Sequence, residues 1–426
     1  MALAPVKEKM SAIFHVSPDA GFANLKAFLQ RVTKSLTATI YEWQPNHISD
    51  VLEAAMKPSG RSLRMVTQKR GVGNSDATET AVEDMKDRLG RKFKHVWASV
   101  RGPQRLIPDS YHIKVASRDG TELWLSSGNW KESNQPVNPT SATTLRKFNR
   151  EWHAVVTNER LATLFQKYIE YDFRQATRFP LEEREAVGVP DIELFVPDDA
   201  LAESLERVPL VTYDDELIID NEVLDIQPLL TPDRDSEGQR MFMRFATDMV
   251  QRAAHSLYIQ NQSFSLTDAN NPEFDAFFEA VKQKQKSIED VRIIFRDARD
   301  YGRPSDLERQ QALLERLKDA GFDVSPDAMR LQPKCHTKGI IVDGREVLLG
   351  SQNLTNGGSL FNRDASLLIR SPKVAAFFET IFLYDWENLA HNEADERVGG
   401  IRRALPGEPT PPGFRRVRLS DLLAGA

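Results

Sequence analysis

The stretch YHIKVASRDGTELWLSSGNW (residues 111–130) returns in altered form as CHTKGIIVDGREVLLGSQN (residues 335–353). Both segments carry histidine, lysine, aspartate, serine and asparagine at the same internal spacing. These residues are His112, Lys114, Asp119, Ser127 and Asn129 in the first segment, and His336, Lys338, Asp343, Ser351 and Asn353 in the second. Two copies of five residue types at fixed spacing indicate a duplicated functional motif rather than chance.

Each segment is predicted to form a β-hairpin. An Asp-Gly dipeptide, which favours a two-residue turn, lies at 119–120 and again at 343–344, with strand-like runs on both sides. In that register Ser127 and Ser351 face the two histidines, and strand alternation places His, Lys, Ser and Asn on one face of each hairpin. The turn aspartates are expected to bond backbone amides and to stabilise the loops.

Other segments also recur in the same order, 213 or 214 residues apart. They are SPD (17–19) with TPD (231–233), FNREW (148–152) with FNRDA (361–365), and IEYDF (169–173) with FLYDW (382–386). A repeat of this length predicts two similar α/β lobes related by a pseudo-twofold axis, rather than a stacked array. Residues near that axis would meet their own counterparts.

The repeat sets the expected domain organisation. An N-terminal lobe is expected over 1–173, an acidic, proline-containing connecting arm over 174–223, a C-terminal lobe over 224–395, and a tail rich in Pro, Gly and Arg over 396–426.

Composition narrows the class of protein. The 426 residues are 40% hydrophobic and carry a net charge of -6, whereas dedicated nucleic-acid binders usually have a basic surplus. No signal peptide and no window of roughly 18 apolar residues is apparent, so a cytoplasmic location without a transmembrane segment is expected. The single cysteine, Cys335, excludes an intrachain disulfide, argues against a thiolate zinc site and is expected in the core.

The motif residues suit the chemistry of a phosphodiester. A neutral imidazole can attack phosphorus, and a protonated one can donate to the departing oxygen. Lysine and asparagine can stabilise the non-bridging oxygens, so this set requires neither metal nor cofactor. Glu151 and Asp364, one after each hairpin, are candidates to orient a histidine and to stabilise its imidazolium.

These residues resemble the HKD signature of the phospholipase D superfamily, and the resemblance runs from about Ser17 to Trp386, the arm excluded. It implies two α/β/α lobes with mixed sheets, one active site at their interface and a two-step reaction through a phosphohistidine. It further implies that His112 is the nucleophile and His336 the acid that later activates water or an alcohol. The reverse assignment of the histidines stays open.

The substrate is less defined than the chemistry. The segment YIQNQSF (258–264) resembles a YIENQ-like segment of many phospholipase D enzymes and favours a phospholipid, while its Asn261 and Gln262 suit a purely structural strand equally well. The leading prediction is hydrolysis or transfer of phosphatidyl groups at the membrane surface. Ser126 replaces the usual glycine, and a polar insertion at 131–148 is expected to form a loop near the mouth of the site that selects substrates.

A metal-independent endonuclease acting on DNA or RNA is the alternative, and a noncatalytic scaffold is the third class. The nuclease would need a basic channel, for which the sequence offers Arg101, Arg105, Arg146, Arg150 and Arg363. Trp124, Trp130 and Trp152, which surround the first hairpin, are expected in the core rather than against substrate. No sequence pattern indicates an oligomeric state.

Overall fold

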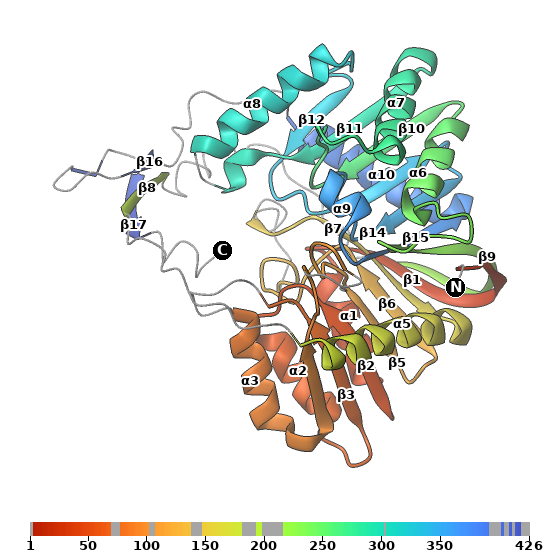
Figure 1. Cartoon of the computed structure of the whole chain (residues 1–426), viewed down its shortest axis with the longest axis vertical. Coiled ribbons are helices and arrows are strands. Elements are labelled where there is room, and N and C mark those ends of the chain that lie inside the picture. Colours follow the sequence, from red (N-terminus) through yellow and green to blue (C-terminus); the bar gives the residue numbers. More distant parts are fainter. Residues whose placement is uncertain are drawn as a thin grey trace.

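The computed structural model describes residues 3–69, 77–101, 107–137, 147–180, 193–197, 216–301, 304–391, 402–403, 409–410 and 414–418. Figure 1 shows the N-terminal half (red to yellow) below the C-terminal half (green to blue), with strands β1 and β9 running between them. Most of the connecting arm and of the tail expected from the sequence lies outside the described residues.

The described parts of the two halves share one series of elements, to which the C-terminal half adds the short helix α9. The N-terminal half has β1 (Val6–Ser17), α1 (Gly21–Gln30), β2 (Ser35–Ile40), α2 (His47–Met56), β3 (Ser62–Thr67), α3 (Ala77–Leu89), β4 (Phe93–Trp97), β5 (Val115–Arg118), β6 (Glu122–Ser126), β7 (Glu151–Thr157) and α5 (Glu159–Arg178). The C-terminal half has β9 (Leu217–Thr231), α6 (Met241–Arg252), β10 (Ser256–Asn261), α7 (Pro272–Ser287), β11 (Asp290–Arg296), α8 (Pro304–Asp319), β12 (Met329–Gln332), β13 (Lys338–Val342), β14 (Glu346–Gly350), α9 (Asn356–Leu360), β15 (Asp364–Arg370) and α10 (Pro372–Asn388).

One 14-stranded mixed sheet runs through both halves in the order β12-β11-β10-β13-β14-β15-β9-β1-β7-β6-β5-β2-β3-β4. The order reads the same from either edge once equivalent strands are matched. β1 and β9 pair antiparallel at the centre, as a twofold relation requires, with Val6 opposite Ile226 and Phe14 opposite Leu217. The α/β fold with two similar lobes and mixed sheets is therefore confirmed.

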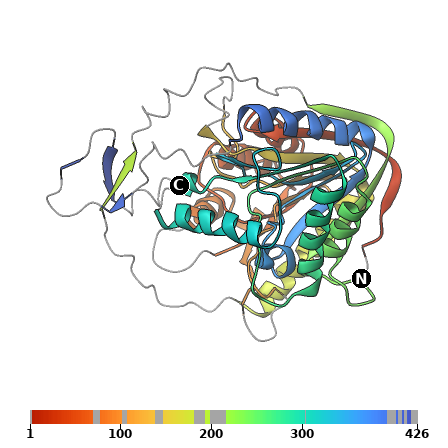
Figure 2. The same ribbon diagram turned by 90° about the horizontal axis from the view of Figure 1, so that it is seen from above.

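Helices cover the strands of each half. In the C-terminal half, α10 (blue) lies on one side of the strands, and α6 and α7 (green and teal) lie on the other (Figure 2). The helix that closes each half starts from a capping side chain: Asn158 accepts from the N–H of Leu161 before α5, and Ser371 accepts from that of Val374 before α10. Both caps satisfy amides that a helix start leaves without an intrahelical partner.

The two halves also pack against each other beyond the central strand pair. The ring of Trp152 on β7 lies so close to Gly339 on β13 that a β-carbon there would approach it to 2.1 Å. Trp124, Trp130 and Trp152 are fully buried, which confirms that they belong to the core. Cys335 is buried too, and burial raises the pKa of its thiol to about 12.

Two regions differ from expectation or extend it. α5 continues to Arg178 and β9 begins at Leu217, so regular structure enters both ends of the range expected for the arm. Within the described residues, β8 (Glu193–Pro197) pairs with β16 (Arg402–Arg403) and β17 (Phe414–Arg418), which joins part of the arm to part of the tail. No described helix combines the length and the apolar character needed to cross a bilayer.

The predicted hairpins form, but their register is shifted by one residue. β5 and β6 pair Arg118 with Glu122, and β13 and β14 pair Val342 with Glu346, so each loop has three residues instead of two. Asp119 and Asp343 adopt positive φ angles of 54° and 51°, a left-handed conformation that Asp tolerates at such loops. The predicted pairing of His112 with Ser127 and of His336 with Ser351, and the face-sharing derived from it, were therefore wrong in register; both serines and both asparagines follow the second strand of their hairpin.

Candidate active site

Each motif histidine is held by the backbone of the opposite half. The N–H of His112 donates to the carbonyl of Arg363 at 2.9 Å, and the N–H of His336 donates to the carbonyl of Arg150 at 3.0 Å. Both histidines precede the first strand of their hairpin and lie outside the regular strands. The sequence Phe-Asn-Arg, repeated in both halves, supplies these anchoring carbonyls.

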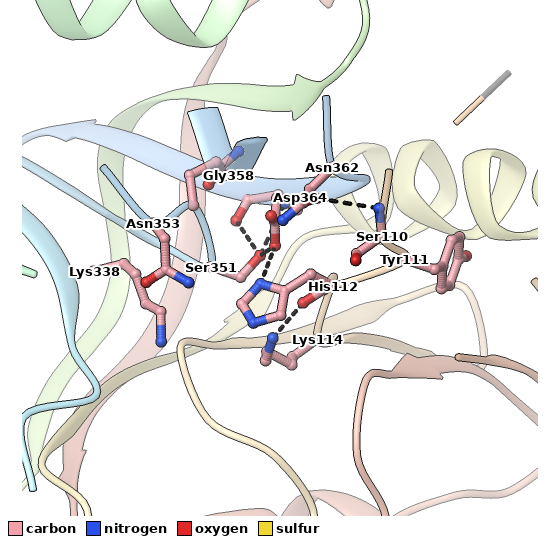
Figure 3. Close-up of polar contacts among 12 residues, drawn as sticks. Ser110, Tyr111, His112, Lys114, Lys338, Ser351, Asn353, Gly358, Asn362 and Asp364 are labelled. Atoms are coloured by element: carbon pink, nitrogen blue, oxygen red, sulfur yellow. Dashed lines mark hydrogen bonds and ion pairs between the residues drawn. The ribbon is translucent and has the colours of Figure 1, made fainter. Parts of the chain in front are cut away.

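The carboxylates that follow the hairpins are exchanged between the halves. His112 Nδ1 forms a 2.9 Å hydrogen bond with Oδ1 of Asp364, which also accepts the hydroxyl of Ser351 (Figure 3). His336 Nδ1 lies 2.9 Å from Oε1 of Glu151, a distance of ion-pair contact without the alignment of a hydrogen bond. Each histidine–carboxylate pair is thus complete only when both halves are present.

The two lysines lie beside the histidines with unlike neighbours. Lys114 Nζ donates to the carbonyl of His112 and lies 5.2 Å from the centre of the Tyr41 ring. Lys338 Nζ donates at 2.8 Å to the carbonyl of His336 and at 2.8 Å to Oε1 of Gln262. Both lysines are buried, so each ammonium group is held in place by a few fixed contacts.

The two motif asparagines also differ in their contacts. Asn129 Oδ1 accepts from the N–H of Glu42 at 3.3 Å, and its Nδ2 lies 3.4 Å from the Glu42 carboxylate. The side chain of Asn353 extends beside Lys338 in Figure 3, and its Oδ1 makes no hydrogen bond with any described residue. Ser127 accepts from the N–H of Trp152 at 3.1 Å, as its counterpart Ser351 accepts from that of Ala365 at 3.2 Å, but Ser351 also donates to Asp364.

Burial and crowding of positive charge shift the acidities of the site. Burial lowers the pKa of His112, with a further contribution from the Lys114 charge that Asp364 opposes. Burial and the charge of Lys338 hold the pKa of His336 well below its usual range. Both imidazoles therefore favour the neutral form in the absence of substrate.

The lysines and Glu151 are shifted as well. Burial lowers the pKa of Lys114 to about 8, and burial together with the charge of Lys114 holds that of Lys338 well below its ordinary value. Burial raises the pKa of Glu151 to about 8, although the Asn134 amide and the two lysines oppose the shift. Perturbed titratable groups of this kind concentrate at functional sites.

The turn aspartates tie each hairpin loop to a neighbouring strand. Asp119 accepts from the backbone N–H groups of Thr33, Lys34 and Ser35 at 2.7 to 2.9 Å. Asp343 accepts in the same way from Ala254, His255 and Ser256. Although burial opposes the shift, these donors lower the pKa of both carboxyl groups.

Two of the arginines assigned to a basic channel are buried ion-pair partners instead. Arg150 donates to Asp19 and Asp385, and Arg363 donates to Asp233 and Asp172; both arginines are 1% exposed. Arg101 pairs with Asp109 at the surface, and Arg105 and Arg146 lie outside the described residues. Two of the five arginines expected to line the basic channel of a nuclease are therefore buried and cannot line it.

These ion pairs give a structural role to the repeated segments SPD, TPD, IEYDF and FLYDW, to which the sequence alone assigned none. Asp19 and Asp233 belong to SPD and TPD, while Asp172 and Asp385 belong to IEYDF and FLYDW. Their common offset was the signal that could have placed them around the repeated arginines. The two polar residues of the segment 258–264 have different contacts. Asn261 accepts from the backbone N–H of Ser263, whereas Gln262 accepts from Lys338 of the second motif.

Sequence reasoning gave no role to Tyr41, Glu42 or Asn134. The Tyr41 ring packs edge-on against His112 with centres 4.7 Å apart, and Asn134, from the insertion, donates to Glu151. Among the described residues, no three His, Cys, Asp or Glu side chains gather as a metal site would need.

Comparison with known proteins identifies a similar family and similar solved structures. Residues 247–386 match the family model described as cardiolipin synthase, PLD-like domain. Phosphatidylserine synthase of Haemophilus influenzae Rd KW20 is 13% identical with a TM-score of 0.57, covering 90% of this chain and 89% of that one. No sequence among curated proteins matches.

Two further solved structures have lower TM-scores. The phospholipase D family member Nuc of Salmonella typhimurium is 21% identical with a TM-score of 0.29 over 40% of this chain and 98% of that one. Polyphosphate kinase of Porphyromonas gingivalis is 12% identical with a TM-score of 0.47 over 91% and 53%. The family match shows a phospholipase D-like domain in the second half of the chain, and the structure of the synthase shows that the chain as a whole shares its fold.

Proposed function

We propose that this protein is a phosphodiesterase of the phospholipase D type, which hydrolyses or transfers phosphatidyl groups through a phosphohistidine without a metal. The observation that carries the proposal is the exchange of carboxylates, which sets His112 against Asp364 and His336 against Glu151 in one buried site. Two histidines supported in this way supply both a nucleophile and an acid, as a phosphodiester requires.

The unlike pairs favour His112 as the nucleophile. Its aligned Nδ1–H···Oδ1 bond to Asp364 fixes the tautomer, which leaves the lone pair of Nε2 free to attack phosphorus. The bond from phosphorus to the alcohol oxygen breaks as Nε2 of His336 donates its proton to that oxygen. Lys114, Lys338, Asn129 and Asn353 are assigned to the non-bridging oxygens, whose charge they would stabilise.

The second step reverses the proton transfer. His336, now neutral, takes a proton from water or an alcohol, whose oxygen attacks phosphorus while the bond to His112 breaks. Water gives phosphatidic acid, and an alcohol gives a new phosphatidyl ester. The pKa of about 8 at Glu151 supports this assignment, because the Glu151–His336 pair then holds one extra proton near neutral pH.

A phospholipid is the proposed substrate. The matching family model is described as cardiolipin synthase, the structure with a TM-score of 0.57 is titled phosphatidylserine synthase, and the net charge is -6. The burial of Arg150 and Arg363 leaves the nuclease alternative with less basic surface. Association with the cytoplasmic face of a membrane is part of the same proposal.

The test is a screen in EDTA of mixed phospholipid vesicles, single-stranded DNA, double-stranded DNA and RNA, with and without ethanol. Phosphatidic acid, replaced in part by phosphatidylethanol when ethanol is present, is the expected product. Cleavage of nucleic acid alone would establish the nuclease instead, and no cleavage of any phosphodiester would contradict both.

The histidine roles are tested by trapping the covalent intermediate from a phosphatidyl ester with labelled phosphorus. His112→Ala is expected to abolish labelling, and His336→Ala to let labelled protein accumulate when the leaving group is p-nitrophenolate. His255→Ala, at an exposed histidine, serves as the control and should behave as wild type. Label retained in the His112→Ala protein would refute this assignment.

A further inference from the structure

The insertion in the first half delivers a side chain to the active site. Asn134, only 1% exposed, donates from Nδ2 to Oε1 of Glu151. The hydroxyl of Ser133 donates to Oδ1 of Asn134 at 3.2 Å, which orients the amide with its NH₂ group toward the carboxylate. The start of the insertion is therefore part of the support of Glu151.

The second half achieves the corresponding support differently. Asp364 accepts the hydroxyl of Ser351, which comes from its own hairpin. In the first half the matching hydroxyl of Ser127 accepts from the N–H of Trp152 and gives no proton to Glu151. The gap from histidine to carboxylate is 39 residues in the first half and 28 in the second, and Asn134 lies in the longer connection between the first hairpin and Glu151.

The same turn also connects Glu151 to the phosphate-binding side of the site. The N–H groups of Asn134 and Gln135 both donate to the carbonyl of Lys131, at 3.1 and 2.9 Å. Lys131 forms a 3.1 Å ion pair with Glu42, whose carboxylate also lies against Asn129. A short segment with one end at Asn129 and the other at Glu151 is thus fixed in place.

An amide donor at Oε1 has a definite chemical effect on the shared proton. It stabilises the carboxylate form of Glu151, and a carboxylate beside Nδ1 stabilises the imidazolium form of His336. Without that donor, the carboxyl group holds the proton more strongly, transfer to His336 becomes less favourable, and Nε2 of a neutral His336 is a poor acid. The other charged groups that act on Glu151 are Lys338, Lys114 and Arg296, none of which appears among its hydrogen-bond donors.

We propose that Asn134 is a positioning residue that favours transfer of the shared proton from Glu151 to His336, so that the segment after the first hairpin helps His336 to act as the acid. The proposal rests on the proposed function. Asn134 does not touch the reacting atoms, and its effect is confined to the steps in which His336 gives or takes a proton.

The experiment compares two phosphatidyl esters that differ in their need for an acid. Phosphatidylglycerol releases an alkoxide that must be protonated, whereas phosphatidyl-p-nitrophenol releases a stable phenolate. Asn134→Ala and the isosteric Asn134→Asp are expected to slow phosphatidylglycerol cleavage by about 10- to 100-fold, the usual cost of losing an outer support. The first burst of p-nitrophenolate should change by less than about 3-fold, because general-acid assistance is not needed there.

Two further variants sharpen the comparison. Glu132→Gln, at an exposed position of the same segment, is expected to leave both rates unchanged. Ser351→Ala removes the hydroxyl from Asp364 on the nucleophile side and should slow the burst with both esters. An unchanged burst in the Asn134 variants also shows that they are folded.

The outcomes separate the two proposals. Equal losses on both esters, or no loss on either, would overturn the role given to Asn134 while leaving the phospholipase activity intact. A wild-type protein that cleaves neither ester would instead contradict the proposed function, and the inference with it.

Discussion

At the scale of single residues, equivalent positions carry unlike chemistry. Tyr41 packs against His112 in one half, and in the other Gln262 bonds Lys338. One carboxylate is supported by a hydroxyl and the other by an amide. A duplicated site with identical halves would give both histidines the same proton affinity, so these differences are what permit separate roles.

The pH dependence of the reaction follows from these residues. Cleavage of phosphatidylglycerol is expected to persist below pH 6.5, because the lowered pKa of His112 keeps the nucleophile neutral there. It should fall above about pH 8, where the Glu151–His336 pair loses its extra proton and Lys114, whose pKa is also about 8, loses its charge. The rate is measured from pH 5 to 10.

The ester with a good leaving group separates the two causes of the alkaline decline. With phosphatidyl-p-nitrophenol the acid is not needed, so the decline that remains in the burst is assigned to Lys114. An increase of either rate between pH 8 and 10 would contradict the protonation states assigned to the Glu151–His336 pair and to Lys114.

At the scale of elements, the hairpins illustrate what a sequence can and cannot predict. Asp-Gly correctly located both loops, but the dipeptide also fits a three-residue loop, and only pairing with β2 and β10 sets the register. The carboxylates of Asp119 and Asp343 reach amides 84 to 89 residues away in the sequence. Local patterns identify the element, whereas its long-range hydrogen bonds come from the assembled sheet.

Substitution of the turn aspartates should affect stability rather than chemistry. Asp119→Ala or Asp343→Ala removes the acceptor for three backbone N–H groups and leaves alanine at a positive φ. A loss of about 1 to 3 kcal/mol in the free energy of unfolding is expected, measured by urea denaturation. Activity per folded molecule should be retained.

Asparagine is the matched replacement at both turns. It keeps an oxygen acceptor and tolerates the left-handed conformation, so Asp119→Asn should cost less than Asp119→Ala. A large loss of activity in a fully folded Asp119→Ala protein would show that this aspartate takes part in catalysis.

At the scale of the whole molecule, the halves depend on each other for a complete site. The common offset of the repeated segments predicted two lobes and their approximate symmetry, and this part of the fold was accessible from sequence. The exchange of carboxylates between the halves could not be predicted from the sequence, because nothing local to Glu151 or Asp364 indicates which histidine each would contact. That information resides in the packing of one half on the other, which also buries the repeated arginines.

The buried arginines provide the last prediction, because each joins separate parts of the chain. Arg150 binds Asp19 of its own half and Asp385 of the other, and its carbonyl accepts from the N–H of His336. Arg150→Met leaves two buried carboxyl groups without their cation, and breaking a buried pair in this way costs about 3 to 5 kcal/mol. Urea denaturation is expected to show this loss, with Arg363→Met behaving alike.

Arg101→Met is the control, since Arg101 pairs with Asp109 at the surface, where such a pair contributes only about 0 to 1 kcal/mol. Replacing Asp385 by Asn in the Arg150→Met protein should recover part of the loss, because one unpaired buried charge is then removed. If Arg150→Met were no more destabilising than Arg101→Met, the buried ion pairs would not hold the two halves together. The packing of β7 against β13 would then have to align both histidine–carboxylate pairs unaided.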